Sequence, residues 1–189
     1  MLTVILIGGN SSRMGRDKAL LPFEGGTFIS SLTERYRTLG PVAVSVNRAG
    51  RFEHGEALEL VDSFPGKGPI NGLYSAFSRT GEQHVFLTAT DIPFGDPSLA
   101  LRLEADLRDY DACVIRRKSR YIEPLFGVYA KSCFKTAESF LSGGDRAMQS
   151  LLKNLNVRYI DEKLLGAWDL DRILTNVNSP EDYRRIIGN

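Results

Sequence analysis

Residues 6–21 read LIGGNSSRMGRDKALL, and they connect a hydrophobic run to a segment that can begin a helix. The run itself, residues 2–7, is apolar and rich in β-branched side chains, which predicts a strand buried on both faces of a sheet. The glycines that follow let backbone N–H groups approach a ligand closely, and Ser11, Ser12, Arg13 and Lys18 add donors. The stretch therefore indicates a phosphate-binding loop, with a solvated surface turn as the alternative interpretation.

This loop matches neither of two common phosphate-binding motifs. The dinucleotide motif GxGxxG needs glycines at its first, third and sixth positions, which GGNSSR does not supply. The Walker motif needs Gly-Lys followed by Ser or Thr, whereas Gly15 is followed by Arg16 and Asp17. The sequence thus argues against a typical dinucleotide-binding fold and against a P-loop NTPase.

Apolar runs and helix start signals alternate along most of the chain. Pro69, Asp96-Pro97 and Ser179-Pro180 are typical helix starts, and Thr27 and Asp145 are expected to cap two more helices. This alternation is typical of an α/β sandwich with a mostly parallel sheet between helix layers, in which ligands bind at the carboxyl ends of the strands. Further strands are expected over residues 42–46, 58–61, 85–88, 112–115, 125–129 and 157–160.

The overall composition is that of a soluble globular protein. The net charge of +1 predicts no general attraction to nucleic acid or membrane, and no segment approaches the ~20 apolar residues of a membrane span. Cys113 and Cys133 are expected to be buried thiols of a reducing compartment, so a cytoplasmic location is predicted. The two histidines, His54 and His84, stand in no catalytic motif, which disfavours a Ser-His-Asp hydrolase.

The loop sequence GGNSSRMGRDKALL resembles the nucleotide-binding signature of the molybdenum cofactor guanylyltransferases. Ile7 departs from that signature, which usually has Ala there, beside the expected base pocket. The resemblance implies one nucleotidyltransferase domain over residues 1–189, with a three-layer αβα, Rossmann-like fold and a mostly parallel mixed sheet. Its N-terminal half would bind nucleotide and its C-terminal half the acceptor. Further matches are Asn47-Arg48, Asp62, GPINGL at residues 68–73, TATDIPF at 88–94, EPLFGVY at 123–129 and NVNSPED at 176–182.

The activity implied by this resemblance is transfer of GMP from GTP to the phosphate of molybdopterin, with release of pyrophosphate. The attacking phosphate is already ionised near neutral pH, so no general base is needed, and catalysis rests on positioning and charge neutralisation. Lys18 and Arg13 are the expected triphosphate cations, and Asp91, after the apolar run 85–88, is the expected Mg²⁺ ligand.

The remaining expected contacts divide between nucleotide and acceptor. A carboxylate such as Asp62 can accept from both N1–H and the 2-amino group of guanine, which adenine cannot offer. Asn176 and Asn178 would face the same way in an extended chain, and are assigned to metal or acceptor phosphate. Arg116 and Arg117 are assigned to the acceptor, with a solvated hairpin face as the alternative. The full expected nucleotide set is Leu6, Ile7, Gly8, Gly9, Lys18, Asn47, Asp62, Gly68, Gly72 and Asp91.

Two other functions stay open from the sequence. The nucleotide could be CTP, or the acceptor another phosphate, within the same chemistry. From a different class, the chain could be a nucleotide-binding accessory protein without turnover, although the presence of both Asp91 and Lys18 argues against that. The resemblance also allows transient contacts with proteins of the cofactor pathway or with molybdoenzymes; no nucleic acid or membrane partner is expected.

Overall fold

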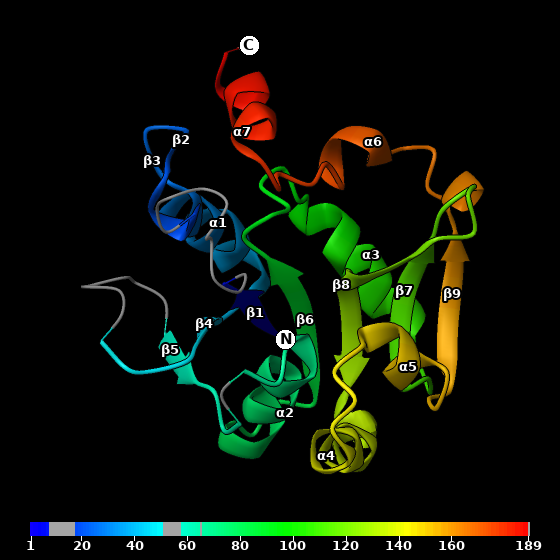
Figure 1. Ribbon diagram of the computed structural model, residues 1–189. Helices are drawn as coiled ribbons and strands as arrows, with labels where there is room; N and C mark the ends of the chain where they lie inside the picture. The colour runs from blue at the N-terminus through cyan, green and yellow to red at the C-terminus, as the bar shows by residue number, and fades with distance from the viewer. Residues whose placement is uncertain (8–17, 51–57, 65, 189) are drawn as a thin grey trace.

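The computed structural model describes residues 1–7, 18–50, 58–64 and 66–188, and a central sheet runs through these ranges (Figure 1). Its seven described strands pair in the order β5-β4-β1-β6-β8-β7-β9. Of these, β8 alone is antiparallel to its neighbours, and every other pair is parallel. Six carboxyl ends and the start of β8 therefore share one edge of the sheet. The bounds are β1 Leu2–Leu6, β4 Val42–Val46, β5 Leu58–Val61, β6 His84–Ala89, β7 Ala112–Arg116, β8 Ile122–Ala130 and β9 Val157–Asp161.

Helices cover both faces of the sheet, which confirms the predicted three-layer α/β sandwich (Figure 1). One apolar cluster packs α1, α3 and α6 against the sheet, and a second packs α2, α4 and α5 against its other face. The longest described helices, α2 and α3, have 11 residues each, and none is long and apolar enough to cross a membrane. The bounds are α1 Phe28–Tyr36, α2 Pro69–Arg79, α3 Pro97–Leu107, α4 Phe134–Gly143, α5 Met148–Leu152, α6 Leu170–Ile173 and α7 Pro180–Ile187.

Most predicted helix starts are confirmed by their caps. The side chains of Thr27, Asp96 and Ser179 each accept a hydrogen bond from a backbone N–H in the first turn of α1, α3 and α7. The prediction that Asp145 caps α5 is wrong. Its carboxylate accepts from the Ala147 N–H at 2.9 Å, which forms a local turn, and the helix begins only at Met148.

A smaller third cluster packs residues 21–28 against residues 177–186 near the C-terminus. It contains Leu21, Phe23, Phe28 and Val177, with Phe94, Tyr183 and Ile186 packed against it. Leu21 follows a short 3-10 helix, η1 (Lys18–Leu20), and Phe23 belongs to a hairpin of β2 (Pro22–Phe23) and β3 (Gly26–Thr27). The cluster thus places the segment that follows the opening loop against α7 and the residues before it.

Gly72 provides a test of how closely α2 packs on the sheet. A Cβ added there would lie 2.4 Å from Leu6 Cδ2 and 3.1 Å from Ser45 Oγ. We therefore expect Gly72→Ala to lower the free energy of unfolding by about 1–3 kcal/mol, the usual cost of overpacking a core. Urea denaturation measures this difference.

Gly143→Ala is the matched control, because Gly143 ends α4 and an added Cβ would meet no described heavy atom within 4 Å. It should leave stability unchanged or slightly raised, as alanine is the better helix former. Equal stability of Gly72→Ala and the unchanged protein would contradict the packing role of Gly72.

Candidate functional site

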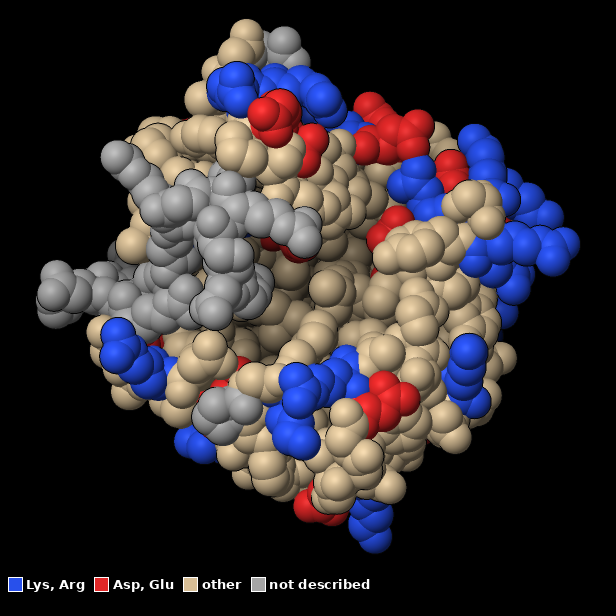
Figure 2. All heavy atoms as spheres, viewed as in Figure 1, with Lys and Arg blue, Asp and Glu red and all other residues tan. Residues whose placement is uncertain are grey.

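A pocket of about 250 Å³ opens where β1, β4, β5 and β6 end, at the edge predicted from the fold class. We call it the strand-end pocket. The space-filling view shows that the visible face is hollowed near its centre (Figure 2). The pocket is lined by Leu6, Ile7, Ser45, Asn47, Asp62, Gly66, Gly68, Pro69, Ala89, Asp91 and Leu125. Six predicted nucleotide-binding residues therefore meet here: Leu6, Ile7, Asn47, Asp62, Gly68 and Asp91.

Asp91 lies just beyond β6 and has an unpaired carboxylate oxygen. Its Oδ1 atom is buried and has no hydrogen-bond partner in the part of the chain that the structure describes. A buried oxygen without a donor is costly unless a ligand satisfies it, and an ionised carboxylate oxygen is a good ligand for a hard cation. The donor set at Asp91 therefore fits a metal ion such as Mg²⁺.

Lys18 approaches Asp91 through the backbone of Val177. The Lys18 ammonium donates to the Val177 carbonyl, and the Val177 N–H donates to the Asp91 carbonyl at 2.9 Å. Burial lowers the pKa of Lys18, while the negative charges of Asp91 and Asp182 oppose that shift. Lys18, Asp91 and Val177, which the sequence places in separate motifs, thus form one local structure.

Asn176 and Asn178 flank this contact on the solvent side. Val177 between them is fully buried and both asparagines are exposed. The Asn176 amide donates to the Leu174 carbonyl at 3.2 Å, and the Asn178 N–H donates to Asp182 Oδ2 at 3.0 Å. These local bonds fix the segment next to Asp91.

Asp62 is held at the pocket by neighbours that the sequence did not indicate. Ser45 Oγ donates to Asp62 Oδ1 at 2.6 Å, and the Asp62 N–H donates to the Val46 carbonyl at 2.8 Å. Burial raises the pKa of Asp62, whereas the side chains of Ser45 and Asn71 counteract the rise. Ser45 was detectable as the one polar residue of the strand VAVSV.

The two predicted glycines of the GPINGL motif have different surroundings. Gly68 lines the pocket, precedes α2 with φ +73°, and lies beside Arg146, whose Cβ would be 3.5 Å from an added Cβ. Gly72 does not line the pocket but packs behind Leu6 and Ser45, which do, so helix–sheet packing explains its need for a glycine. A nucleotide contact at Gly72 stays a prediction without support from its position.

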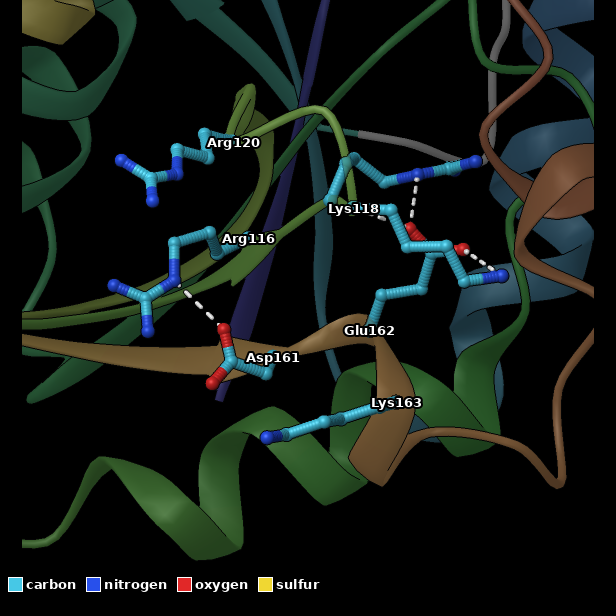
Figure 3. A pocket seen from close by; sticks show the side chains of 7 residues that line it. Arg116, Lys118, Arg120, Asp161, Glu162 and Lys163 are labelled. Carbon is cyan, nitrogen blue, oxygen red and sulfur yellow. Dashed lines mark hydrogen bonds and ion pairs between the residues drawn. The ribbon is translucent and has the colours of Figure 1, made fainter.

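Arg116 and Arg117 lie away from the strand-end pocket, in a separate basic pocket of about 520 Å³ (Figure 3). Arg117 is only 17% exposed and contacts Glu162 at 3.1 Å, the Leu170 carbonyl at 3.1 Å and the Asp171 carboxylate. Its position therefore indicates a structural ion-pair network, not a phosphate site. Arg116 pairs with Asp161 at 2.7 Å and is 43% exposed. The basic pocket is lined by Arg116, Arg117, Lys118, Arg120, Asp161, Glu162 and Lys163.

Other predicted residues fall outside the pocket or outside the described residues. Arg13, Gly8, Gly9 and His54 are not among the described residues. His84 contacts Glu104 at 3.3 Å, away from the predicted motifs. Cys113 and Cys133 are free and buried as expected, and burial raises the pKa of each thiol to about 12. The Trp168 indole donates to Ser98 Oγ at 2.9 Å and packs on the core.

Sequence reasoning missed the start of β8. Tyr121, Glu123 and Leu125 reach the carboxyl edge because β8 is antiparallel to β6. Partial burial raises the pKa of Tyr121, and the negative charges of Glu123 and Asp91 raise it further. Burial also raises the pKa of Glu123, against the effect of Arg117. The EPLFGVY motif was the available signal, but the sequence did not give the strand direction.

Residues 3–159 match the sequence family described as MobA-like NTP transferase domain. The chain belongs to this family. A relative from Carboxydothermus hydrogenoformans, named probable molybdenum cofactor guanylyltransferase, is 32% identical over 188 residues, covering 98% of this chain and 95% of its own.

Solved structures of MobA-like and related proteins agree with this assignment. The structure of molybdopterin-guanine dinucleotide biosynthesis protein A from Archaeoglobus fulgidus superposes with a TM-score of 0.83 at 27% identity, covering 98% of this chain and 96% of that one. A 2-C-methyl-D-erythritol 4-phosphate cytidylyltransferase from Thermus thermophilus has a TM-score of 0.67 at 12% identity, with 96% and 94% covered, and shows the fold alone. The predicted Rossmann-like nucleotidyltransferase fold is thus confirmed.

Asp182, in the N-terminal cap of α7, makes the stability of the fold depend on pH. Asp182 accepts from the N–H of Asn178, from Ser179 Oγ and from the Ser179 N–H, and these bonds hold its pKa below the ordinary value. A lowered folded-state pKa stabilises the fold above the ordinary pKa of Asp, and this contribution is lost as pH falls through the lowered value. We expect Asp182→Asn to lower the melting temperature at pH 7, with a difference that shrinks below about pH 4.

Thermal unfolding followed by circular dichroism between pH 7 and pH 3 measures the effect. Glu181→Gln is the matched control, because Glu181 is on the same turn and pairs only with Arg184 among the described residues. A melting-temperature difference for Asp182→Asn that stays constant over the whole range would show that the cap does not titrate as described.

Proposed function

We propose that this protein transfers GMP from GTP to the phosphate of molybdopterin, forming the guanine dinucleotide cofactor and releasing pyrophosphate. Membership of the MobA-like NTP transferase family makes it a nucleotidyltransferase. The names of its relatives from C. hydrogenoformans and A. fulgidus support molybdopterin as acceptor and guanine as base. The observation that carries the proposal is the arrangement of Asp91 at the carboxyl edge of the sheet. Its buried Oδ1 has no hydrogen-bond partner among the described residues, while its backbone carbonyl accepts from the Val177 N–H and the Val177 carbonyl accepts from Lys18.

The reaction joins two anions, so the protein has to place them and reduce their repulsion. Lys18 is the proposed triphosphate cation; burial lowers its pKa, and the negative charges of Asp91 and Asp182 partly oppose that shift. Arg13 is a second proposed cation on the same loop. Asn176 and Asn178 present amide groups on the solvent side of the Asp91 contact, where an acceptor phosphate can bind.

Asp91 is the proposed ligand for Mg²⁺. No group of three or more His, Cys, Asp or Glu side chains in the described ranges could hold a metal. Mg²⁺ commonly binds to one or two carboxylates and takes its other ligands from substrate phosphates and water, so a single carboxylate suits it. When bound, the ion would neutralise charge on the phosphate oxygens.

The chain is proposed to be one domain over residues 1–189. We assign base selection to its strand-end pocket and acceptor binding to its C-terminal half. The Asp62 carboxylate can accept the paired N–H groups of guanine, with Asn47 at the rim and Ile7 and Leu6 alongside. Arg116 remains a proposed acceptor contact, whereas Arg117 is occupied by Glu162 and Asp171. The cytoplasmic location and contacts with pathway proteins stay predictions.

Pyrophosphate release tests the proposed substrate pair. The protein is incubated with Mg²⁺, molybdopterin and one of GTP, CTP, ATP or UTP. We expect release with GTP, dependent on both Mg²⁺ and molybdopterin, since Asp62 matches guanine. Release with CTP and not GTP would contradict the guanylyl assignment, and a thermal shift with GTP but no release would indicate a binding protein without turnover.

Replacing Asp91 tests the proposed metal ligand. Asp91→Asn keeps the shape of the side chain but removes its charge, so we expect kcat to fall by about 100-fold or more, the scale of losing one charge contact to a reacting group. The melting temperature should fall only slightly, because Oδ1 has no hydrogen-bond partner among the described residues and the removed charge only counteracts the effect of burial on Lys18. Asp96→Asn, five positions on, is the control, since Asn also caps α3. Unchanged kcat in Asp91→Asn would refute the metal role.

A further inference from the structure

Arg35 connects two segments that build the candidate site, although it lies outside the strand-end pocket. It is in the last turn of α1, and its Nη1 donates to the Pro93 carbonyl, two residues after Asp91. Its Nη2 contacts Glu24 Oε2 at 2.6 Å. The two side chains are 21% and 46% exposed, so the pair is partly shielded from solvent. One guanidinium thus holds the Asp91 segment on one side and the β2–β3 turn on the other.

The backbone of Glu24 gives an independent indication that its carboxylate is needed. Glu24 and Gly25 form the two-residue turn between β2 and β3, with φ of +49° and +80°. A side chain at the first position of such a turn is disfavoured unless it is Asn, Asp or Gly. Glutamate there carries a backbone cost that a glycine would avoid, and its carboxylate reaches Arg35.

An aromatic contact links the same two segments. Phe94, three residues after Asp91, meets Phe23 of β2 edge-on, with ring centroids 5.6 Å apart. Phe23 also stacks on Phe28 at 4.8 Å. The hairpin in turn continues from the Lys18 helix, where the Leu21 N–H donates to the Lys18 carbonyl at 3.1 Å. Because the hairpin follows directly on the Lys18 segment, a displacement of Glu24 or Phe23 is expected to displace Lys18 as well.

We propose that Arg35 and Glu24 are positioning residues, which fix the Lys18 segment at its working separation from Asp91. The expected kinetic effect rests on the proposed function. Neither residue lines the strand-end pocket, so any effect on the reaction would be indirect. A misplacement of about 1 Å at a reacting group can lower the rate by up to about 100-fold. Losing the link should therefore lower kcat more than it weakens nucleotide binding, because the strand-end pocket, which supplies most of the proposed nucleotide contacts, is left in place.

Glu24→Gly separates positioning from stability. Glycine accepts the positive φ without strain, so this variant should melt at the same or a higher temperature. It also removes the carboxylate, and we expect kcat for pyrophosphate release to fall about tenfold, with KM for GTP within about twofold of the original value.

Arg35→Met should reproduce this kinetic effect, and Arg35→Lys should restore part of it, since lysine offers one point contact instead of a fork. Because the two residues act as one link, Glu24→Gly combined with Arg35→Met should be no slower than Arg35→Met alone. Arg102→Met is the matched control: Arg102 forms an (i,i+4) ion pair with Asp106 on α3 at 2.7 Å, and its loss should leave kcat unchanged.

Hydrogen exchange of the ligand-free protein tests the link without relying on catalysis. The Ile92 and Gly95 amides, which bond to Ala89 and Ile92, should exchange faster in Arg35→Met and Glu24→Gly than in Arg102→Met. If the unchanged protein releases no pyrophosphate, the proposed function is wrong. Hydrogen exchange then still tests whether Arg35 and Glu24 hold the segment after Asp91. Full kcat in Glu24→Gly, or unchanged exchange of these amides in Arg35→Met, would overturn the proposal.

Discussion

The backbone of Val177 is the point on which the candidate site depends. Its N–H donates to the Asp91 carbonyl, its carbonyl accepts from the Lys18 ammonium, and its side chain is buried with Leu21, Phe23 and Phe28. The Lys18 and Val177 positions are 159 residues apart in the chain. Because one residue bonds to both partners, it connects the Lys18 segment, the residues after β6 and the C-terminal segment, and the proposed metal carboxylate stays next to the proposed phosphate lysine.

The direction of the strands explains why this contact lies beside a pocket. Parallel strands end at one edge of the sheet, and the antiparallel β8 brings its first residues to the same edge. The strand-end pocket forms on the β1 side, where Ser45 fixes Asp62. On the β9 side, Arg117 connects the end of β7 to Glu162 and Asp171. The two pockets therefore differ: the strand-end pocket contains a carboxylate oxygen without a partner among the described residues, whereas ion pairs of Arg116 and Arg117 hold the basic pocket.

Local sequence signals predicted the parts that depend on neighbouring residues. Apolar runs located the sheet strands, and Thr27, Asp96 and Ser179 located helix starts, because periodicity and capping act within a few residues. Three features were missed, one because its strands are very short and two because distant partners decide them. The β2–β3 hairpin is too short to show a pattern, Arg117 is neutralised from 54 residues away, and Gly72 is shaped by Leu6 on another element.

The central claim is that Lys18, Asp91 and the segment 176–178 form one metal and phosphate site. Mn²⁺ replaces Mg²⁺ as a paramagnetic probe, and with GTP present its effect on asparagine side-chain amide signals is followed by NMR. The account predicts strong broadening of Asn176 and Asn178, while Asn154, which donates to Ser150 on α5, stays sharp. Sharp signals for Asn176 and Asn178 at saturating Mn²⁺ and GTP would contradict it.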